Sequence, residues 1–344
     1  MTHPSGRVTA QFTIGFPPAN TQGDIATLLV MLFGKVSLDG RIRLVDLQLP
    51  DAFLAQLPGP RFGIPGLRRT LNRPERPLTM SIFKPCVGLT PQELGAMFFE
   101  QAVGGSDLVK DDEILPDLDI CPTEARLEAC LSAAERARRE TGRLTLYAVN
   151  LSGPASTLLQ QADRLVSLGA KCLLFNVLAY GYPFLEALAR DSKVNVPIMA
   201  HPALAGAIGS APEHGIAYPI ILGTLMRAGG ADIVLYPSSY GSVALPQAET
   251  MAIKATLTGP LGNVARVFPG PSAGIHPGMV PQILHDYGSD VIINAGGGVH
   301  GHPQGARAGA KAFQQALDFA LQGRPVGLAE NAPELAQALG LWSR

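Results

Sequence analysis

The sequence predicts an α/β protein, a (β/α)8 barrel preceded by a small α+β segment. From Pro77 onward, short β-rich runs alternate with helical patterns, and eight such units at spacings of roughly 25 to 35 residues fill the length that a barrel of this kind needs. Most predicted strands are continuously apolar rather than alternating. That pattern is typical of a parallel sheet covered by helices on its outer face.

The strand and helix predictions follow the chain in order. Strands are expected at Leu78–Lys84, Leu108–Asp112, Leu144–Leu151, Cys172–Leu178, Val196–His201, Asp232–Pro237, Val264–Phe268 and Val291–Ala295. Helices are expected at Pro91–Val103, Thr123–Thr141, Ala155–Leu168, Gln247–Leu257 and Gly305–Leu321. The first helix has a clear start signal, because Thr90 can cap it, Pro91 suits its first turn and Glu93 completes a capping box.

The first 76 residues break this rhythm. Val8–Pro17 reads as a strand, Asp24–Phe33 as a helix and Ile42–Leu47 as a strand, and the Pro- and Arg-rich stretch Pro58–Arg76 leads into the barrel. We therefore predict a partial N-terminal α+β domain at 1–76 and a catalytic barrel at 77–344. The N-terminal piece is too short to bury a good core alone, so we expect it to pack on the barrel or on a second subunit.

Composition excludes several classes of protein. Hydrophobic residues make up 47% of the 344 residues, charged residues only 16%, and the net charge is −1, which argues against a nucleic-acid surface. No apolar run is long enough to span a membrane, and the start of the chain lacks a signal-peptide core, so a cytoplasmic protein is expected. The four cysteines, at 86, 121, 130 and 172, show no CxxC spacing, which favours isolated reduced thiols.

Polar residues follow nearly every predicted strand, at the end of the barrel where active sites lie. They are Lys84, Lys110, Asp112, Glu113, Asn150, Asn176, His201, Ser238-Ser239, Ser272-Ala273-Gly274 and Asn294–Gly298. A purely structural barrel has no reason to gather so many polar groups at one mouth. The sequence therefore predicts an enzyme with its site there.

Asp112 and Glu113 could hold Mg²⁺, which prefers oxygen ligands. Lys110 is an unusual neighbour for a cation, unless its neutral amine captures CO2 as a carbamate and so becomes an oxygen ligand. A Lys–Asp salt bridge is an equally good interpretation of the spacing, and a solvated loop is the simplest interpretation of the acidic run by itself.

The late glycines 296–298 allow backbone N–H groups to approach an anion, as in barrels that bind phosphate near their last strands, although a flexible turn would look the same. His201 is either a substrate contact or a core histidine. His276, His300 and His302 lack the spacing of a zinc site.

These motifs resemble the ribulose-bisphosphate carboxylase superfamily. Lys110-Asp111-Asp112-Glu113 looks like its carbamylated-lysine metal signature, Phe83-Lys84-Pro85 its strand-1 lysine and His201-Pro202 its strand-5 histidine. Ser272-Ala273-Gly274 and Gly296-Gly297-Gly298 look like its phosphate loops. The longer segments resemble the carboxylase-like enolases of methionine salvage, which act on 2,3-diketo-5-methylthiopentyl-1-phosphate; they are Phe33-Gly34-Lys35, Leu57–Gly63, Leu146–Leu151, Leu174–Val177, Tyr240–Pro246 and Ser272–Pro281.

This resemblance implies a homodimeric, Mg²⁺-dependent keto–enol isomerase. Lys35 would be the base and Lys84 a second catalytic group, and carbamylated Lys110 would hold the metal together with Asp112 and Glu113. The substrate contacts it implies are Lys84, Asn150, His201, Gly274, Gly296 and Gly297.

The chain departs from the carboxylase pattern in three places. Cys86 replaces a second lysine, and Ser238-Ser239-Tyr240-Gly241 lacks the mobile lysine that holds CO2, so we expect no carboxylation. The chain also begins later than the family pattern, which suggests a truncated N-terminal domain. Two alternatives remain open: an isomerase or decarboxylase of another phosphorylated sugar or sugar acid, and a catalytically impaired family member.

Overall fold

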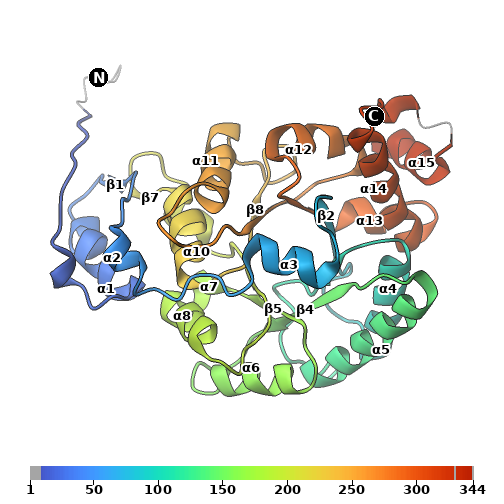
Figure 1. The fold of residues 1–344 in the computed structure, drawn as a ribbon, viewed down its shortest axis with the longest axis horizontal. Helices are drawn as coiled ribbons and strands as arrows, with labels where there is room; N and C mark the ends of the chain where they lie inside the picture. The colour runs from blue at the N-terminus through green and yellow to red at the C-terminus, as the bar shows by residue number, and fades with distance from the viewer. Residues whose placement is uncertain (1–8, 329–330, 343–344) are drawn as a thin grey trace.

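The protein forms the predicted barrel. The structure is a computed structural model that describes residues 9–328 and 331–342. Its eight-stranded sheet has the order β10-β2-β3-β4-β5-β6-β8-β9, every paired neighbour is parallel, and β9 and β10 also lie in contact, which closes the sheet (Figure 1). The strands are β2 (Leu78–Ile82), β3 (Leu108–Lys110), β4 (Leu146–Leu151), β5 (Cys172–Phe175), β6 (Ile198–Ala200), β8 (Ile233–Pro237), β9 (Phe268–Ser272) and β10 (Ile292–Ala295).

Helices surround this sheet. They are α4 (Pro91–Val103), α5 (Thr123–Thr141), α6 (Leu158–Ser167), α7 (Val177–Tyr180), α8 (Tyr182–Arg190), α9 (Ala205–Gly209), α10 (Leu225–Gly229), α11 (Gln247–Thr258), α12 (Val280–Tyr287), α13 (Gly297–His300), α14 (Gly305–Leu321) and α15 (Pro333–Trp342). α4, α5 and α14 have the predicted bounds. The capping box of α4 is present, with the Thr90 side chain accepting from the Glu93 amide and the Glu93 carboxylate accepting from the Thr90 amide.

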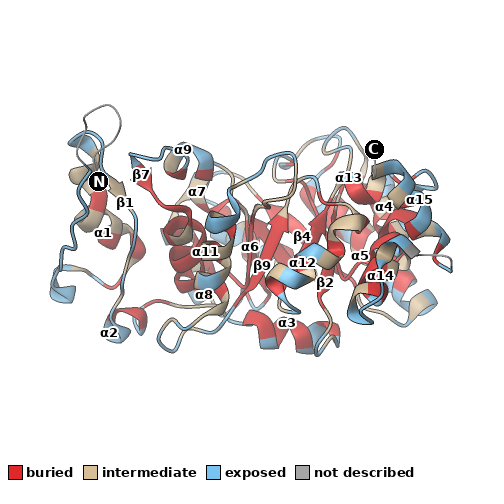
Figure 2. Ribbon diagram, turned by 90° about the horizontal axis from the view of Figure 1, so that it is seen from above, coloured by how far each residue is buried: buried red, intermediate tan, exposed pale blue. Residues whose placement is uncertain are grey.

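A separate apolar cluster fills the inside of the barrel, and a helix closes one end of it. α3 (Gly63–Leu71) places Ile64, Leu67 and Leu71 in the same cluster as inward residues near the starts of the strands, such as Leu78 and Leu108. Figures 1 and 2 show α3 lying across the barrel at this end. The amino ends of the strands are therefore covered, and the polar residues that follow the strands lie at the other end.

The N-terminal segment packs against the side of the barrel. It contains α1 (Ile25–Leu29), a π-helical turn (Val30–Gly34) and α2 (Asp51–Leu54). The buried Ile25 amide donates to the Glu186 carboxylate on α8 at 2.9 Å. β1 (Arg43–Leu44) pairs in parallel with β7 (Gly215–Ile216) and forms a small second sheet.

Several predicted bounds were wrong. Residues 9–17 form no strand, and Val8 lies outside the described residues; the strand expected at 42–47 is only β1. The strand expected at Val264–Phe268 begins instead at Phe268 and runs to Ser272, through a Pro-Gly-Pro stretch whose composition hides it. The strand expected at Cys172–Leu178 ends at Phe175, and the helix expected at Ala155–Leu168 begins at Leu158.

Two further expectations concern the cysteines and the possibility of a membrane-spanning helix. All four cysteines are free. Among the described residues, no helix is both long and apolar enough to cross a membrane. The sequence start on which the signal-peptide expectation depends lies outside the described residues.

Candidate active site at the carboxyl ends of the barrel strands

Lys84, Lys110, Asp112 and Glu113 converge just beyond β2 and β3. The Lys84 Nζ donates to Asp112 Oδ2 at 2.7 Å, which joins the ends of the two strands. The Lys110 Nζ lies 3.7 Å from Glu113 Oε2 and donates to the Asp111 carbonyl at 2.9 Å. Lys110 aligns with Ile82 and Ala148 on the neighbouring strands and is only 1% exposed. The four predicted site residues are therefore close together, with Lys110 and Asp112 shielded from water and Lys84 and Glu113 partly exposed.

This geometry sets the charge of each group. Burial lowers the pKa of Lys110, although the nearby carboxylates act in the opposite direction. Lys110 therefore loses its proton to form the neutral amine more readily than an exposed lysine does. Burial acts against the ionised form of Asp112, yet the hydrogen bond from Lys84 and the charge of Lys110 lower its pKa to about 2. Burial also opposes the charge on Lys84, but its bonds to Asp112 and Cys86 raise its pKa overall. Asp112 is thus a carboxylate and Lys84 an ammonium at neutral pH.

His201 completes this side of the site as a neutral imidazole. Its Nε2 lies 3.2 Å from Glu113 Oε2, and its Nδ1 accepts from the Ala203 amide at 3.2 Å, which assigns the proton to Nε2. Burial and the positive charge of Lys110 hold the pKa of His201 well below its usual range. His201 therefore donates a hydrogen bond to Glu113 and orients its carboxylate.

Two buried amides support the same loop. The Nδ2 atoms of Asn150 and Asn176 both donate to the Glu113 carbonyl at 3.2 Å, and Asn150 also donates to Leu115 O at 2.9 Å. Within the described residues, their Oδ1 atoms are buried and accept no hydrogen bond. Such orphaned oxygens are costly unless a ligand or water uses them. The sequence predicts both residues at strand ends, but only Asn150 as a substrate contact; the fold brings Asn176 to the same carbonyl.

Asn294, the first residue of the predicted Asn294–Gly298 stretch, is a further candidate. It is 1% exposed on β10, and neither its Nδ2 nor its Oδ1 has a partner among the described residues. It shares its side of the strand with Ile292, which belongs to the cluster inside the barrel. The two-residue period from Ile292 was the available signal.

The three acidic residues at 111–113 have two different roles. Asp111 is fully buried and accepts hydrogen bonds from Arg126 Nε at 3.0 Å, from the Tyr147 hydroxyl at 2.5 Å and from the backbone N–H of Asn150 at 2.9 Å. With all these partners it has a structural role. Asp112 and Glu113 are left facing the site.

The predicted phosphate loops lie against each other. A Cβ on Gly298 would come within 2.2 Å of the Ile275 carbonyl, and one on Gly296 within 3.2 Å of Lys84 Cε. Gly274 has a positive φ of 71° and packs on the loop after β8, where a Cβ would meet Ser242 N at 2.6 Å. Gly297 faces open space, since its Cβ would meet nothing within 4 Å. These contacts bring both glycine loops and Lys84 to one corner of the mouth.

Lys35 is not part of this cluster within one chain. It lies exposed at the end of the π-helical turn in the N-terminal segment, and no ion pair or side-chain hydrogen bond forms on it in the described part of the chain. The three late histidines do not form a metal site either. His276 stacks on Trp342, His302 contacts the Glu334 carbonyl, and the described residues contain no group of three His, Cys, Asp or Glu placed to hold a metal.

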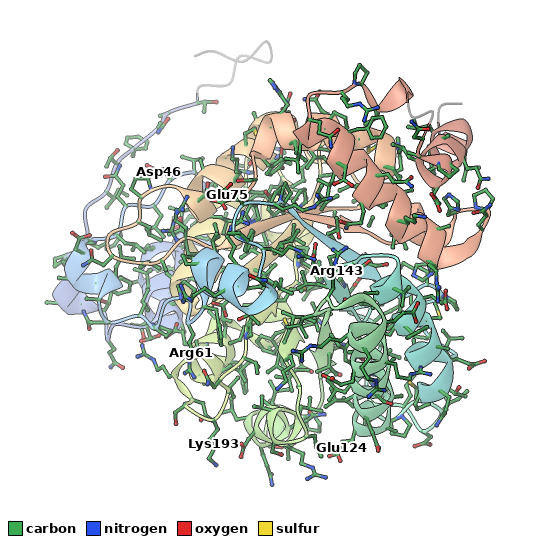
Figure 3. All side chains as sticks on the ribbon, turned by 45° about the vertical axis from the view of Figure 1, so that its right-hand side comes forward. Asp46, Arg61, Glu75, Glu124, Arg143 and Lys193 are labelled. Carbon is green, nitrogen blue, oxygen red and sulfur yellow. The ribbon has the colours of Figure 1, made fainter. Side chains whose placement is uncertain are left out.

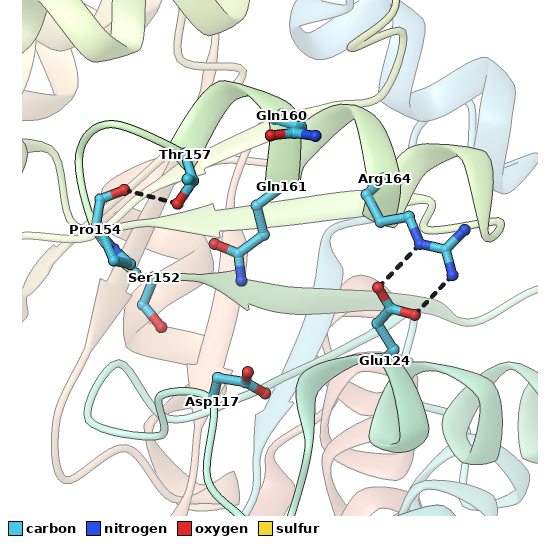
Figure 4. Close-up of a pocket in the computed structure, with 9 residues that line it drawn as sticks. Asp117, Glu124, Ser152, Pro154, Thr157, Gln160, Gln161 and Arg164 are labelled. Atoms are coloured by element: carbon cyan, nitrogen blue, oxygen red, sulfur yellow. Dashed lines mark hydrogen bonds and ion pairs between the residues drawn. The ribbon is translucent and has the colours of Figure 1, made fainter.

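A polar hollow of about 400 Å³ lies outside the predicted site, beside the loop that follows β4 (Figure 4). The Arg164–Glu124 ion pair lies at one side of it, with two contacts of 2.9 Å, and Ser152 and Asp117 lie at the other. None of the predicted site residues lines this hollow.

Comparisons with known proteins agree with the geometry. A 2,3-diketo-5-methylthiopentyl-1-phosphate enolase of Geobacillus kaustophilus is 49% identical over 330 residues, which cover 96% of this chain and 80% of that protein. The crystal structure of a rubisco-like protein (MtnW) from Alicyclobacillus acidocaldarius matches with a TM-score of 0.92 and 51% identity, over 95% of this chain and 82% of that one. A dimeric archaeal Rubisco from Hyperthermus butylicus matches with a TM-score of 0.87 and 30% identity, over 94% and 79%.

The family model for the ribulose bisphosphate carboxylase large chain, catalytic domain, matches residues 63–342. This range includes every predicted site residue except Lys35. The chain belongs to the ribulose bisphosphate carboxylase large-chain family.

Proposed function

We propose that this protein is the Mg²⁺-dependent enolase of methionine salvage, a cytoplasmic enzyme that converts 2,3-diketo-5-methylthiopentyl-1-phosphate to its enol. The observation that carries the proposal is the convergence of Lys84, Lys110, Asp112, Glu113 and His201 at the mouth of the barrel. Relatives that carry this enzyme's name are 47–49% identical over nearly the whole chain. The proposal extends their activity to this chain.

The donor set fits Mg²⁺ held with a carbamate on Lys110. A carbamate forms from a neutral amine, and Lys110 is the desolvated amine of the site. Asp112 and Glu113 contribute carboxylate oxygens, which Mg²⁺ prefers. Lys110, Asp112 and Glu113 would thus be the ligands. When bound, the ion would supply Lewis acidity that polarises a substrate carbonyl.

The remaining residues would bind the substrate and handle the proton. Lys84 is a cation beside Asp112, so it suits donation to a developing enolate oxygen better than proton removal. His201 and Asn150 would contact substrate oxygens around Glu113. The backbone N–H groups of Gly274, Gly296 and Gly297 would hold the phosphate, and Gly296 lies against the Lys84 stem.

Lys35 would remove the proton next to the carbonyl, and it would come from a second subunit. The support is its position, exposed on the N-terminal segment and unpaired among the described residues. A homodimer in which this segment reaches the partner's barrel mouth would complete the site. Apolar side chains of the segment agree with such a contact, since Leu38 is 82% and Phe12 81% exposed.

This chain lacks two lysines that the carboxylase pattern has. Fixing CO2 onto an enediolate requires a cation over the new carboxylate, and the loop after β8 offers Ser238 and Ser239 instead of a lysine. Cys86 stands where the family pattern has a second lysine, and it accepts a hydrogen bond from Lys84 at 3.0 Å. Proton removal with a stabilised oxyanion requires neither missing lysine.

The test is exchange of the proton beside the carbonyl in deuterated buffer, followed by NMR of the diketone phosphate. We expect exchange and enol formation that require Mg²⁺, and no incorporation of labelled CO2 into ribulose bisphosphate. A folded, metal-loaded protein that exchanges no proton, or labelled product from ribulose bisphosphate, would show the assignment to be wrong.

A further inference from the structure

Three arginines gather at the end of the barrel opposite the proposed active site. Arg73 and Arg76 come from the segment between α3 and β2, and Arg143 comes from the segment between α5 and β4. Together with Gln314 and Asp318 of α14 they line a cavity of about 290 Å³. The Arg143 position, labelled in Figure 3, is tied to the start of β3 by a 3.0 Å hydrogen bond from its Nη2 to the Gly105 carbonyl.

The cavity carries more positive charge than its carboxylates neutralise. Arg73 Nε lies 3.0 Å and Arg143 Nη2 3.5 Å from the same oxygen, Asp107 Oδ1. Asp107 is 2% exposed and is also used by the fold, because its Oδ2 accepts from the Thr79 amide at 2.9 Å. Arg76 pairs with Asp318 at 2.6 Å, but the Asp318 side chain is 53% exposed, so water screens that pair. Three guanidiniums thus share two carboxylates.

Donors remain unused in this cluster. Within the described residues, neither Nη group of Arg73 has an acceptor, and the same holds for Arg143 Nε and Nη1. The arginines also repel one another. Burial lowers the pKa of Arg143, and the positive charges of Arg73 and Arg76 act in the same direction, against the attraction of Asp107. The unused donors of Arg73 and Arg143 are therefore available to an anion in the cavity, since the two side chains are 23% and 33% exposed.

We propose that this arginine cluster is a binding site for a phosphate-type dianion, either free phosphate or the phosphate group of a small monoester. A planar guanidinium with two parallel N–H groups matches the oxygens of phosphate, and charge-assisted bonds of this kind are stronger than neutral ones. A dianion would accept hydrogen bonds from the free N–H groups of Arg73 and Arg143, and its negative charge would offset the excess positive charge of the cavity. The apolar cluster inside the barrel, to which α3 contributes, separates this arginine cluster from the glycine loops, so the anion site is independent of the proposed reaction.

The test is calorimetric titration of the full-length protein with inorganic phosphate at constant ionic strength, in chloride buffer. Arg76→Gln removes one positive charge from the cavity and keeps both ion pairs of Asp107, so the buried carboxylate stays paired. We expect Arg76→Gln and Arg143→Gln to lower the number of phosphate ions bound per chain by one, or to weaken that site about 10-fold or more. Turnover by Arg76→Gln should stay at the wild-type level. Arg138→Gln, an exposed arginine of α5, is the matched control and should leave the titration unchanged.

A second titration with glycerol phosphate distinguishes the two sources. Equal affinity would assign the site to a phosphomonoester group, and binding of inorganic phosphate alone would assign it to the free ion. Soaking wild-type crystals, grown without sulfate or phosphate, in selenate gives a readout that needs no variant. An anomalous peak beside Arg73 and Arg143 is expected. Identical phosphate binding by wild type and both variants, or no peak at the cluster, would overturn the proposal.

Discussion

The guanidinium of Arg126 and the carboxylate of Asp111 form an ion pair, Nε to Oδ2 at 3.0 Å, in which neither side chain has exposed surface. Arg126 Nη1 donates to the carbonyls of both Pro116 and Cys121, at 3.1 and 3.2 Å. One side chain on α5 thus holds both ends of the loop that carries Asp112 and Glu113. The positions of the proposed metal ligands depend on a residue that does not face the site.

Replacing Arg126 should therefore be severe. Arg126→Met would leave Asp111 buried without its counter-charge, and breaking a buried pair in this way costs about 3–5 kcal/mol of unfolding free energy. Urea unfolding followed by circular dichroism measures the loss. Arg138→Met, on the exposed face of the same helix, is the control and should change stability by less than about 0.5 kcal/mol. Similar stability in the two variants would contradict this account of the loop.

Lys110→Ala should abolish Mg²⁺-dependent activity, because it removes the amine on which the carbamate forms. Bicarbonate should activate the wild-type enzyme for the same reason. The carbamate itself can be observed by NMR after addition of ¹³C-bicarbonate, as a signal absent from Lys110→Ala. Lys171→Ala, which removes an exposed lysine just before β5, should keep both the signal and the activity. Full activity in Lys110→Ala would refute the carbamate hypothesis.

The shared site can be tested by mixing two inactive variants. If Lys35 of one subunit serves Lys110 of the other, a dimer of one Lys35→Ala and one Lys110→Ala chain has one intact site. Unfolding and refolding the variants together should then restore about a quarter of wild-type activity, because about half of randomly paired dimers are mixed. Sedimentation measures the dimer in parallel. No restored activity in a verified mixed dimer would place both lysines in one chain, and an active monomer would exclude the shared site.

Asp232 should make stability depend on pH. Its buried carboxylate accepts from the amides of Phe62, Gly63 and Ile198 at 2.7, 2.8 and 3.0 Å, yet burial outweighs these bonds and raises its pKa from 3.8 to about 6. The folded protein then binds the proton more tightly than the unfolded chain does. The contribution of this proton to the unfolding free energy is fully present below pH 4. It is lost as the pH rises to about 6, which lowers the unfolding free energy by about 3 kcal/mol.

Asp232→Asn cannot titrate, so its unfolding free energy should lack that part of the decline between pH 4 and 6. Urea unfolding of both proteins at several pH values measures the difference. Asp163→Asn, a carboxylate with a 39% exposed side chain that pairs with Lys193 at the surface, is the control and should follow the wild type. Parallel curves for wild type and Asp232→Asn would show that Asp232 stays ionised through this range.

The comparison of expected and observed elements shows where sequence patterns carry information. α4 and α5 have the predicted bounds, and Thr90, Pro91 and Glu93 mark the start of α4 within the local sequence. β9 was misplaced because its Pro-Gly-Pro composition argues against a strand, while pairing with β8 from Ile233 to Pro237 imposes one. The short helices α7 and α9 have too few residues for a helical period to appear in the sequence.

For this protein, the sequence by itself determined the parallel barrel, and it predicted the end at which the proposed site lies and its candidate residues Lys84, Lys110, Asp112, Glu113 and His201. These follow from periodicity and from residue type, which are local properties. The tertiary structure alone decided that Asp111 turns away to Arg126, that the Asn176 Oδ1 and the Asn294 amide are buried with no partner among the described residues, and that Arg73 meets Arg143. Each depends on burial and on contacts between residues far apart in the chain, because the cost of an unpaired polar group is defined only once the surrounding water has been removed.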